Sequence, residues 1–298
     1  MKTRQVQIIN GRRIAEKIRH SLKSKIAKLR KKPGLAIIMV GKNQASEVYV
    51  RLKKKAAHEV DINFYKYLLP AKTCFNRLVR LIEMLNRNKK INGIVVQFPL
   101  PRHLDEDRIV EAIDPKKDVD GFHPANVASL MSCPSTLRQV KGSGPGGRPQ
   151  IIPGVLAGIL WLLESTKVGL KNKSCVILSN AKVLAEPLAF LLEQKKLRTK
   201  IIYPPFHSIK KSLRLADIVI SAVGRPQFIK GNMIKSGSIL LDVGFSRLKG
   251  KAVGDFDFAS CSKKAGYITP VPGGVGPMTV AMLLFNVLRA YEIQHKQI

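Results

Sequence analysis

The chain has 298 residues, of which 45% are hydrophobic and 24% charged. This composition excludes an intrinsically disordered chain and allows one large or two medium α/β domains. No apolar run is long enough to span a bilayer, and the basic start from Met1 to Gln5 lacks the apolar core of a secretory signal, so we expect a cytoplasmic protein without a membrane segment.

The chain is strongly basic, with 52 Lys and Arg residues against 20 acidic ones and a formal net charge of +32. An excess of this kind is typical of nucleic-acid-binding proteins. Here the basic residues are spread over the whole chain, with no basic tail, zinc-finger spacing or RNA-recognition aromatic motif. We therefore expect a general compositional bias and no specific nucleic-acid partner, although the surface would also attract anionic small molecules.

The cysteines are few and far apart in the sequence. None of them forms a Cys-x-x-Cys pair, so the sequence predicts neither a disulfide framework nor a zinc or other metal site. A reducing cytoplasm fits this usage best. The four residues are Cys74, Cys133, Cys175 and Cys261.

The first half of the chain alternates helical and strand patterns. Apolar residues recur at helical spacing over 7–32, and short apolar runs between polar turns predict strands. In order, we expect a helix over 7–32, a strand at Leu35–Val40, a helix to about Glu59, a strand at Asn63–Leu68, a helix over about Thr73–Asn88, a strand at Gly93–Gln97 and a helix over about Asp105–Ile113. Strands that alternate with helices predict a mostly parallel sheet.

The helix after the first strand carries a candidate proton-transfer group. Ser46, Tyr49 and Lys53 stand at positions i, i+3 and i+7, so they share one helix face. A lysine beside a phenol is a useful acid or base when its surroundings bring its pKa toward neutrality. The alternative is a solvated basic helix face. The adjacent basic residues that favour this alternative are Arg51, Lys54 and Lys55.

Polar residues also follow the later strands, at the sheet edge where ligands bind in such folds. Gln97 closes the third strand, and its amide could orient a lysine. Asp118 and Asp120 sit on a turn beyond it, where a carboxylate could bind an amino or guanidine-like group of a ligand. As alternatives, Gln97 caps a strand and the two aspartates form a turn with Gly121.

The second half has the rhythm of a Rossmann domain. A Gly-, Pro- and Arg-rich stretch over 138–152 predicts a loop or linker. Beyond it, we expect a helix over about Val155–Glu164, a strand at Ser174–Ser179, a helix over about Ala185–Gln194, and strands at Thr199–Tyr203, Ile218–Ser221 and Ser238–Val243. The turn over 179–185 has no glycine, whereas a dinucleotide fingerprint needs glycines there. By motif alone, this turn does not support cofactor binding.

The C-terminal region combines a rigid turn with a last helix. The segment 268–279 is rich in proline and glycine, and its glycines permit close backbone approach to a ligand. A helix over about Val280–Tyr291 has an apolar face, which predicts that it packs back onto the body of the protein.

Four segments together carry a family resemblance. They are Tyr49-Val50-x-x-Lys53-x-Lys55, Val96-Gln97-Phe98-Pro99-Leu100-Pro101, Lys117-Asp118-Val119-Asp120-Gly121-Phe122 and the turn from Pro270 to Thr279. In order and spacing, they resemble the signatures of the tetrahydrofolate dehydrogenase/cyclohydrolase family. The likeness runs from about Gly11 to Ala290.

The resemblance implies a fold and an assembly. We expect an α/β protein with two domains around a cleft, the first an N-terminal parallel-sheet domain and the second Rossmann-like. The folate-binding catalytic domain would comprise 1–122 and 272–298, and the Rossmann-like nucleotide-binding domain would comprise 123–271. The resemblance also implies a homodimer.

The resemblance further implies an activity. Family members oxidise 5,10-methylene-tetrahydrofolate to the methenyl form with NADP or NAD, and hydrolyse the methenyl form to 10-formyl-tetrahydrofolate. By position, Lys53 would be essential to the hydrolysis, Gln97 would hold the lysine and Tyr49 would stack on the folate ring system. Asp120 would bind the amino edge of the pterin. The remaining substrate-binding residues would be Val96, Pro272, Gly273 and Gly274.

The departures from the family pattern lie in the nucleotide half. Where the family reads Gly-Arg-Ser-x-Ile-Val-Gly-x-Pro, the segment 179–187 has Ser179 and Ala185 at the two glycine positions, Asn180 at the arginine position and Ala181 at the serine position. A Cβ at Ser179 and another at Ala185 would crowd a pyrophosphate. The cofactor-binding candidates are Ser179, Asn180, Ala181, Ser208 and Phe245.

Three functions follow from these observations. The first is the interconversion of methylene-, methenyl- and 10-formyl-tetrahydrofolate by a dehydrogenase and a cyclohydrolase activity. The second is a cyclohydrolase alone, with a degenerate dinucleotide site. The third is a non-catalytic basic binding protein, against which the intact Lys53, Gln97 and Asp120 argue.

Overall fold

The computed structural model describes residues 5–132 and 151–295. They divide into two compact units. The N-terminal unit comprises Ala15–Gly154 with Val280–Ile298, and the Rossmann-like unit comprises Met1–Ile14 with Val155–Thr279. The linker expected over 138–152 lies outside the described residues apart from 151–152, and the domain boundaries expected from the sequence stay a prediction.

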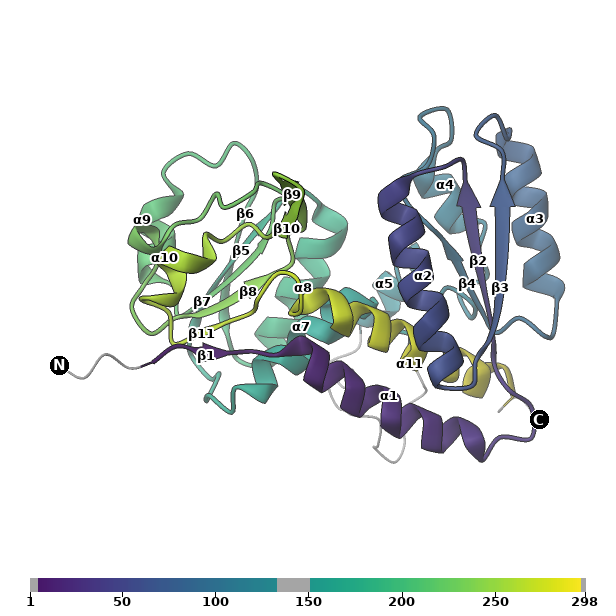
Figure 1. Cartoon of the computed structure of the whole chain (residues 1–298), viewed down its shortest axis with the longest axis horizontal. Helices are drawn as coiled ribbons and strands as arrows, with labels where there is room; N and C mark the ends of the chain where they lie inside the picture. The colour runs from purple at the N-terminus through teal and green to yellow at the C-terminus, as the bar shows by residue number, and fades with distance from the viewer. Residues whose placement is uncertain (1–4, 133–150, 296–298) are drawn as a thin grey trace. The chain divides into compact units, whose positions relative to one another are not determined.

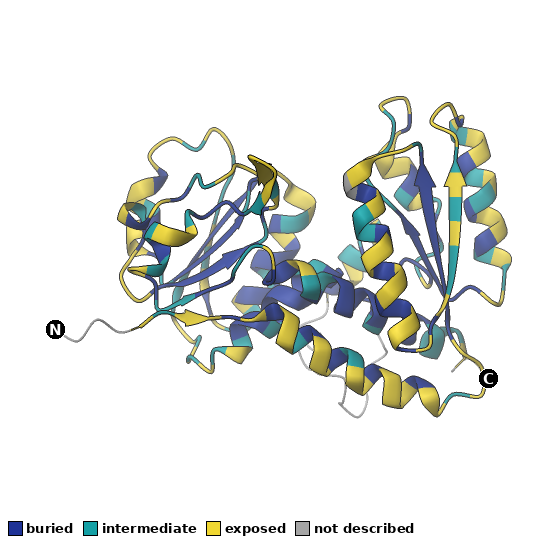
Figure 2. Cartoon of the chain, in the orientation of Figure 1, coloured by how far each residue is buried: buried dark blue, intermediate teal, exposed yellow. Residues whose placement is uncertain are grey.

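The N-terminal unit is built on a three-stranded parallel sheet, as the alternating pattern predicts. Its strands lie in the order β3 (Asn63–Leu69), β2 (Gly34–Val40) and β4 (Gly93–Val96). The central strand β2 is buried along its whole length, whereas the edge strand β3 has exposed positions (Figure 2). Because Ile38 pairs with Val96, strands β2 and β4 end at the same edge of the sheet.

Helices cover both faces of this sheet (Figure 1). Helix α2 (Gln44–Glu59) begins where the Asn43 side chain accepts a hydrogen bond from the Ser46 amide, a cap that fixes the start of the helix. Helix α3 (Phe75–Arg87) buries Leu78, Ile82 and Leu85 at helical spacing against the opposite face. Two shorter helices follow the sheet, α4 (Glu106–Glu111) and α5 (Pro124–Ser132).

The Rossmann-like unit holds a six-stranded parallel sheet in the order β1-β11-β8-β7-β5-β6. Its strands are β1 (Gln7–Ile8), β5 (Ser174–Ser179), β6 (Arg198–Ile202), β7 (Ile218–Ala222), β8 (Ile239–Asp242) and β11 (Tyr267–Ile268). A separate antiparallel pair is formed by β9 (Ser246–Leu248) and β10 (Lys251–Val253). The helices are α7 (Gly154–Ser165), α8 (Lys182–Gln194), α9 (Ile209–Leu215) and α10 (Phe258–Ser262), with a 3₁₀ turn at Gly231–Met233.

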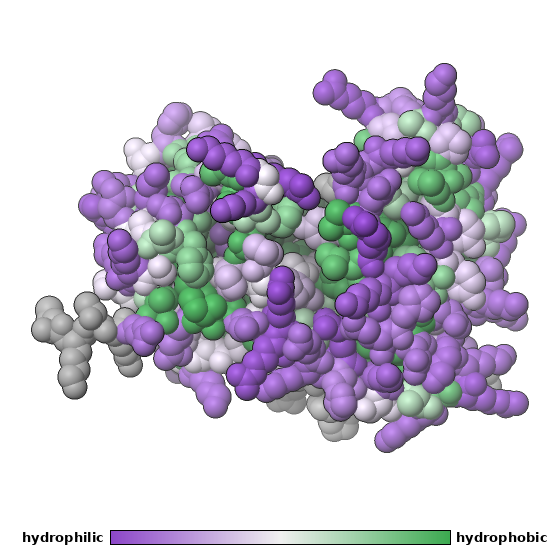
Figure 3. Space-filling view, in the orientation of Figure 1, coloured by the Kyte–Doolittle hydropathy of each residue, from purple (hydrophilic) through white to green (hydrophobic). Residues whose placement is uncertain are grey.

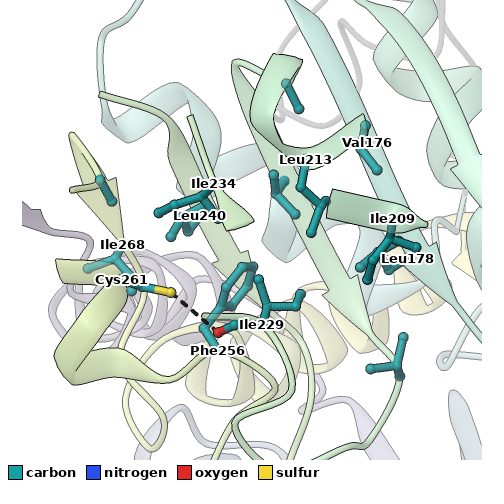
Figure 4. Packing of buried hydrophobic residues seen from close by; sticks show 14 residues of the cluster. Val176, Leu178, Ile209, Leu213, Ile229, Ile234, Leu240, Phe256, Cys261 and Ile268 are labelled. Atoms are coloured by element: carbon teal, nitrogen blue, oxygen red, sulfur yellow. Dashed lines mark hydrogen bonds between the residues drawn. The ribbon is translucent and has the colours of Figure 1, made fainter. Parts of the chain in front are cut away.

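The core of the Rossmann-like unit is apolar and includes a cysteine (Figure 4). Leu178, Leu213 and Leu240 are fully buried in it. The Cys261 thiol lies among these side chains and donates to the Ile229 carbonyl at 3.4 Å. Burial, with a contribution from nearby Asp257, raises the pKa of Cys261 to about 12, so the thiol acts as a small apolar group.

Three of the described helices, α1, α7 and α11, carry residues of both units, and the limits of α1 and α11 differ from the prediction. The helix expected over 7–32 is the strand β1 followed by α1 (Gly11–Ala27). A Cβ at Gly11 would overlap the Gly274 carbonyl oxygen, so this glycine allows the start of α1 to approach the backbone of Gly274 closely. Helix α11 (Val275–His295) begins inside the predicted Pro/Gly turn, since Pro277 is tolerated in a first helical turn.

The elements of the second half are otherwise close to the prediction. Helix α8 begins at Lys182 and not at about Ala185, so the turn after β5 is shorter than expected. The sequence patterns did not reveal the two-residue strands β1 and β11 or the β9–β10 pair. Within the described part of the chain, no helix combines the length and apolar character needed to cross a membrane.

Candidate active site

Lys53 is the buried member of a basic helix. Its side chain is 8% exposed, whereas Arg51, Lys54 and Lys55 on the same helix are exposed. The Lys53 Nζ donates a hydrogen bond to Gln97 Oε1 at 3.0 Å. The ammonium group therefore faces a neutral amide oxygen, and it retains further N–H donors for a ligand.

Gln97 is held in one orientation by its neighbours. It follows β4 directly. Its backbone N–H donates to the Ile38 carbonyl at 2.9 Å, and this bond continues the ladder between β2 and β4. Its side-chain Nε2 donates to the Phe98 carbonyl at 2.9 Å, and the buried Ser46 hydroxyl donates to the same carbonyl at 3.2 Å. Because Nε2 is engaged there, Oε1 is the end of the amide that meets Lys53.

Tyr49 lies one helical turn before Lys53 on α2 and is half-buried. Burial raises the pKa of its phenol above the ordinary value of 10.0, so the hydroxyl stays protonated at neutral pH. A half-buried aromatic ring beside an amine offers an apolar face for a flat ligand. The structure thus places Ser46, Tyr49 and Lys53 along one helix, as their spacing predicts.

Asp118 and Asp120 lie on the turn that follows α4, and this turn runs along the side of β4 that faces away from β2. Asp118 forms a parallel bridge with Ile94, so the chain here runs alongside β4 toward the edge that carries Gln97. Asp118 is buried and binds the turn itself, including the Gly121 amide at 3.0 Å, which is the structural role that the sequence left open for it. Asp120 is half-buried on the same turn.

The other expected substrate residues differ in their surroundings. Val96 belongs to the apolar cluster between the sheet and α3, so its backbone is the part that could meet a ligand. Pro272, Gly273 and Gly274 belong to the Rossmann-like unit. The Gly273 carbonyl accepts from the Arg12 amide at 3.1 Å, and a Cβ at Gly274 would lie 2.6 Å from the Thr269 Cβ, so these glycines have packing roles of their own.

The turn between β5 and α8 is the expected nucleotide-binding loop. Helix α8 has 13 residues, and its N-cap Ala181 supplies no side-chain cap to the first turn. Such a helix start, after the first strand of a parallel sheet, suits an anionic pyrophosphate. Lys182 is exposed in the first turn and adds a positive charge. The uncapped helix start and the charge of Lys182 therefore fit the phosphates of a dinucleotide.

Two side chains of the turn compete with that ligand. The Ser179 hydroxyl accepts the Ala181 amide at 3.1 Å, which occupies an N–H group that could bind a phosphate oxygen. The Asn180 Nδ2 donates to the Val223 carbonyl at 2.7 Å. Since β5 and β7 are neighbours, this bond spans the carboxyl ends of two adjacent strands, where nucleotides bind in such sheets.

The remaining cofactor candidates lie on loops of the same unit. Ser208 precedes α9 with a φ of 56°, in the left-handed region, and makes no side-chain cap. Phe245 follows β8 and is exposed, as a residue that stacks on a ligand would be.

A buried carboxylate pair lies at the end of β8, and sequence reasoning assigned it no role. Asp242 accepts from the amides of Asp255 and Phe256, each at 3.0 Å, while Asp255 accepts from the Ser221 hydroxyl at 2.8 Å. Burial raises the pKa of Asp242 to about 7, and the charge of Asp255 adds to the effect. The only sequence signal was the pair of segments Asp242-Val243-Gly244 and Gly254-Asp255.

Metal binding has no candidate in the described ranges, since no three or more His, Cys, Asp and Glu residues gather there in a way that could hold an ion.

Comparison with known proteins gives one consistent result. Residues 9–120 match the catalytic domain of tetrahydrofolate dehydrogenase/cyclohydrolase, and residues 153–295 match its NAD(P)-binding domain. The bifunctional protein FolD of Acetivibrio thermocellus is 40% identical over 296 residues, which cover 98% of this chain and 99% of that protein.

Solved structures agree with the sequence matches. The FolD methylenetetrahydrofolate dehydrogenase/cyclohydrolase of Campylobacter jejuni superposes with a TM-score of 0.89 at 37% identity, over 97% of this chain and 99% of that one. The enzyme of Trypanosoma brucei, solved with NADP cofactor and inhibitor, has a TM-score of 0.87 at 34% identity, over 97% of this chain and 98% of that one. The chain therefore belongs to the tetrahydrofolate dehydrogenase/cyclohydrolase family.

Proposed function

We propose that this protein interconverts 5,10-methylene-, 5,10-methenyl- and 10-formyl-tetrahydrofolate, as an NADP-dependent dehydrogenase and a methenyl cyclohydrolase. The observation that carries the proposal is the buried Lys53 bound to Gln97 at 3.0 Å. Relatives named as bifunctional proteins, at about 40% identity over nearly the whole chain, support the pairing of the two activities.

In the hydrolysis, Lys53 acts as the proton shuttle. The methenyl carbon is an electrophilic iminium, so water adds to it and must lose a proton, and the departing ring nitrogen must gain one. A lysine that alternates between its charged and neutral forms can serve both transfers. Gln97 keeps the Lys53 Nζ in place for them, because its own amide is fixed by the Phe98 carbonyl.

The folate would be oriented by two further residues of the N-terminal unit. The half-buried ring of Tyr49 would stack on the folate ring system, next to the amine of Lys53. The carboxylate of Asp120 would accept hydrogen bonds from the amino edge of the pterin. Pro272, Gly273 and Gly274 would complete the substrate site.

NADP, when bound, supplies the acceptor for the hydride that leaves the methylene carbon. In this chain, the first-turn amides of α8 and the Lys182 ammonium would bind its phosphates. Ser179, Asn180 and Ala181 would line the same turn, while Ser208 and Phe245 would contact the nucleotide from neighbouring loops. NAD is the alternative cofactor, because the turn lacks the arginine that commonly meets the extra phosphate of NADP.

The test follows both reactions on the same purified sample. We expect NADP-dependent formation of methenyl-tetrahydrofolate from the methylene form, measured by its absorbance, and hydrolysis of supplied methenyl-tetrahydrofolate faster than in buffer. Absence of both turnovers, with salt-sensitive binding to nucleic acid in their place, would instead support a non-catalytic basic protein.

A cyclohydrolase without dehydrogenase activity is the second candidate. It is favoured by the Ser179–Ala181 and Asn180–Val223 hydrogen bonds, which NADP would have to displace. Hydrolysis with no oxidation in the presence of either NADP or NAD would select this candidate. Robust NADP-dependent oxidation would rule it out.

We also propose a homodimer that works in the cytoplasm. The family resemblance supports the dimer, and the exposed free thiol of Cys74 supports a reducing compartment. Sedimentation equilibrium of the purified protein, expected at twice the mass of the 33.1 kDa chain, tests the first point. Fractionation of the source cells tests the second.

A further inference from the structure

We infer that Asp118 and Asn286 are positioning residues that hold the peptide chain on both sides of Asp120, so that its carboxylate meets the pterin. The inference rests on the proposed role of Asp120. It gives a role to two residues to which the family signatures assign none. One of them, Asn286, lies on α11, which is far from Asp120 in the sequence.

Asp118 binds the chain that follows Asp120. One carboxylate oxygen accepts from the Gly121 amide at 3.0 Å, and the other accepts from the His123 amide at 2.8 Å and from Asn126 Nδ2 at 3.1 Å. The residue is 2% exposed. Burial raises the pKa of Asp118, with a further contribution from the charge of Asp120, while these hydrogen bonds act in the opposite direction.

Asn286 binds the chain that precedes Asp120. It lies in the middle of the apolar helix α11 and is 2% exposed. Its Nδ2 donates one hydrogen to the Val119 carbonyl at 2.9 Å and the other to the Ile152 carbonyl at 2.8 Å. Both donors of the amide nitrogen are therefore used to tie two loop segments together.

These contacts fix three consecutive residues. Val119 is held through its carbonyl by Asn286, and Gly121 is held through its amide by Asp118. Between them, the Asp120 carbonyl accepts from the Gly154 amide at 3.4 Å. The backbone that carries the Asp120 side chain is thus bound before, at and after that residue.

The polar identity of both side chains calls for a reason beyond packing. A buried amide or carboxylate is stabilising only when it is fully hydrogen-bonded, and an apolar residue of similar size often serves a core equally well. Leucine at 286 would match its neighbours on α11. The amide is instead used to set the position of a loop, and the residue that this loop presents is Asp120.

The test is a double-mutant cycle on the folate kinetics. We expect Asn286→Leu to raise the KM for the folate substrate roughly tenfold, with a small change in kcat, since a misplaced Asp120 loses a charged hydrogen bond. We expect Asp118→Asn to act in the same way. The new side-chain NH2 group cannot accept a hydrogen bond, so either the Gly121 or the His123 backbone N–H would lose its acceptor. In an Asp120→Ala background, neither substitution should raise KM further.

A buried asparagine elsewhere in the unit serves as the matched control. Asn92 is also 2% exposed and hydrogen-bonded, its Oδ1 accepting from the Gly34 amide at 2.9 Å, but it lies just before β4, at the amino end of the sheet. We expect both Asn92→Leu and Asn286→Leu to lower the unfolding temperature. We expect Asn92→Leu to leave KM unchanged. This comparison separates loss of stability from loss of position.

The outcomes are distinguishable. If Asp120→Ala itself leaves KM unchanged, the proposed role of Asp120 fails, and the inference fails with it. If Asp120→Ala raises KM but Asn286→Leu and Asp118→Asn do not, only the inference is overturned. It is also overturned if their effects on KM multiply with that of Asp120→Ala, because they would then act independently of it.

Discussion

Gln97 shows how one residue is constrained to serve another. Its Nε2 is engaged by the Phe98 carbonyl, so its oxygen faces Lys53. We expect Gln97→Leu to lower the hydrolysis rate by about 10² or more, within the range that positioned acid–base groups contribute. Hydrolysis of supplied methenyl-tetrahydrofolate, timed by its absorbance, measures this. Gln294→Leu, which removes bonds to the Asn92 and Lys116 carbonyls, is the control and should hydrolyse at the normal rate.

Gly121 is a second residue whose identity the structure explains. Its φ is +84°, and a Cβ there would lie 2.6 Å from the Pro153 nitrogen. Gly237 has a similar φ of +76° but nothing within 4 Å, so it isolates the backbone effect. We expect Gly237→Ala to lower the free energy of unfolding by about 1–2 kcal/mol, and Gly121→Ala to lower it by clearly more. Chemical denaturation measures both, and equal losses would contradict the clash.

Among the structural elements, the β5–α8 turn is the one whose sequence departs from the family pattern. Ser179→Gly would free the Ala181 amide and remove a Cβ from the turn. We expect NADPH to bind about 2–10-fold more tightly to this variant, the equivalent of one hydrogen bond. Fluorescence titration of NADPH measures the affinity without turnover. Ser174→Gly at the other end of β5 is the control, and weaker binding to Ser179→Gly would show that the hydroxyl serves the cofactor.

The end of strand β8 is expected to make stability depend on pH. The pKa of Asp242 is raised by burial from 3.8 to about 7, so the folded protein holds a proton there that the unfolded chain releases. The free energy of unfolding should therefore fall as the pH rises from about 4 to about 7, by up to about 1.4 kcal/mol per pH unit for this group. Denaturation of wild type and Asp242→Asn across this range measures it. An equally steep fall in the variant would assign the slope to other groups.

The elements that sequence reasoning predicted are those with their own local pattern. The apolar run from Leu35 to Val40 and the helical spacing of Ser46, Tyr49 and Lys53 are local, and both predictions are confirmed. The Lys53–Gln97 contact followed from the rule that parallel strands end at one edge. Asn286 could not be predicted, because its partners Val119 and Ile152 are brought to it by tertiary packing alone.

The turn after β5 could be predicted from the sequence only in part. Its lack of glycine is visible in the sequence, but the bond from Asn180 to Val223 is not, because it depends on β5 and β7 being neighbours in the sheet. The strand β1 was missed for a similar reason. It is two residues long and exists only through its pairing with β11.

At the scale of the whole molecule, the net charge of +32 is the dominant property. Hydrophilic side chains cover most of the face seen in Figure 3, and the exposed side of α1 is rich in lysine and arginine. Such a surface attracts anionic folate and NADP, and salt screens the attraction. We expect KM for both to rise between about 0.05 and 0.5 M salt while kcat changes little. A neutral osmolyte serves as the control. A KM that does not change with salt would show that surface charge does not contribute to the binding of folate or NADP.

If Lys53 transfers the protons of the hydrolysis, loss of its amine should abolish the reaction. Methenyl-tetrahydrofolate is supplied to wild type, to Lys53→Met and to Lys55→Met, whose side chain is exposed on the same helix. We expect rapid hydrolysis by wild type and by Lys55→Met, and a rate near that of buffer alone for a folded Lys53→Met. Hydrolysis by Lys53→Met at the wild-type rate would contradict this role of Lys53.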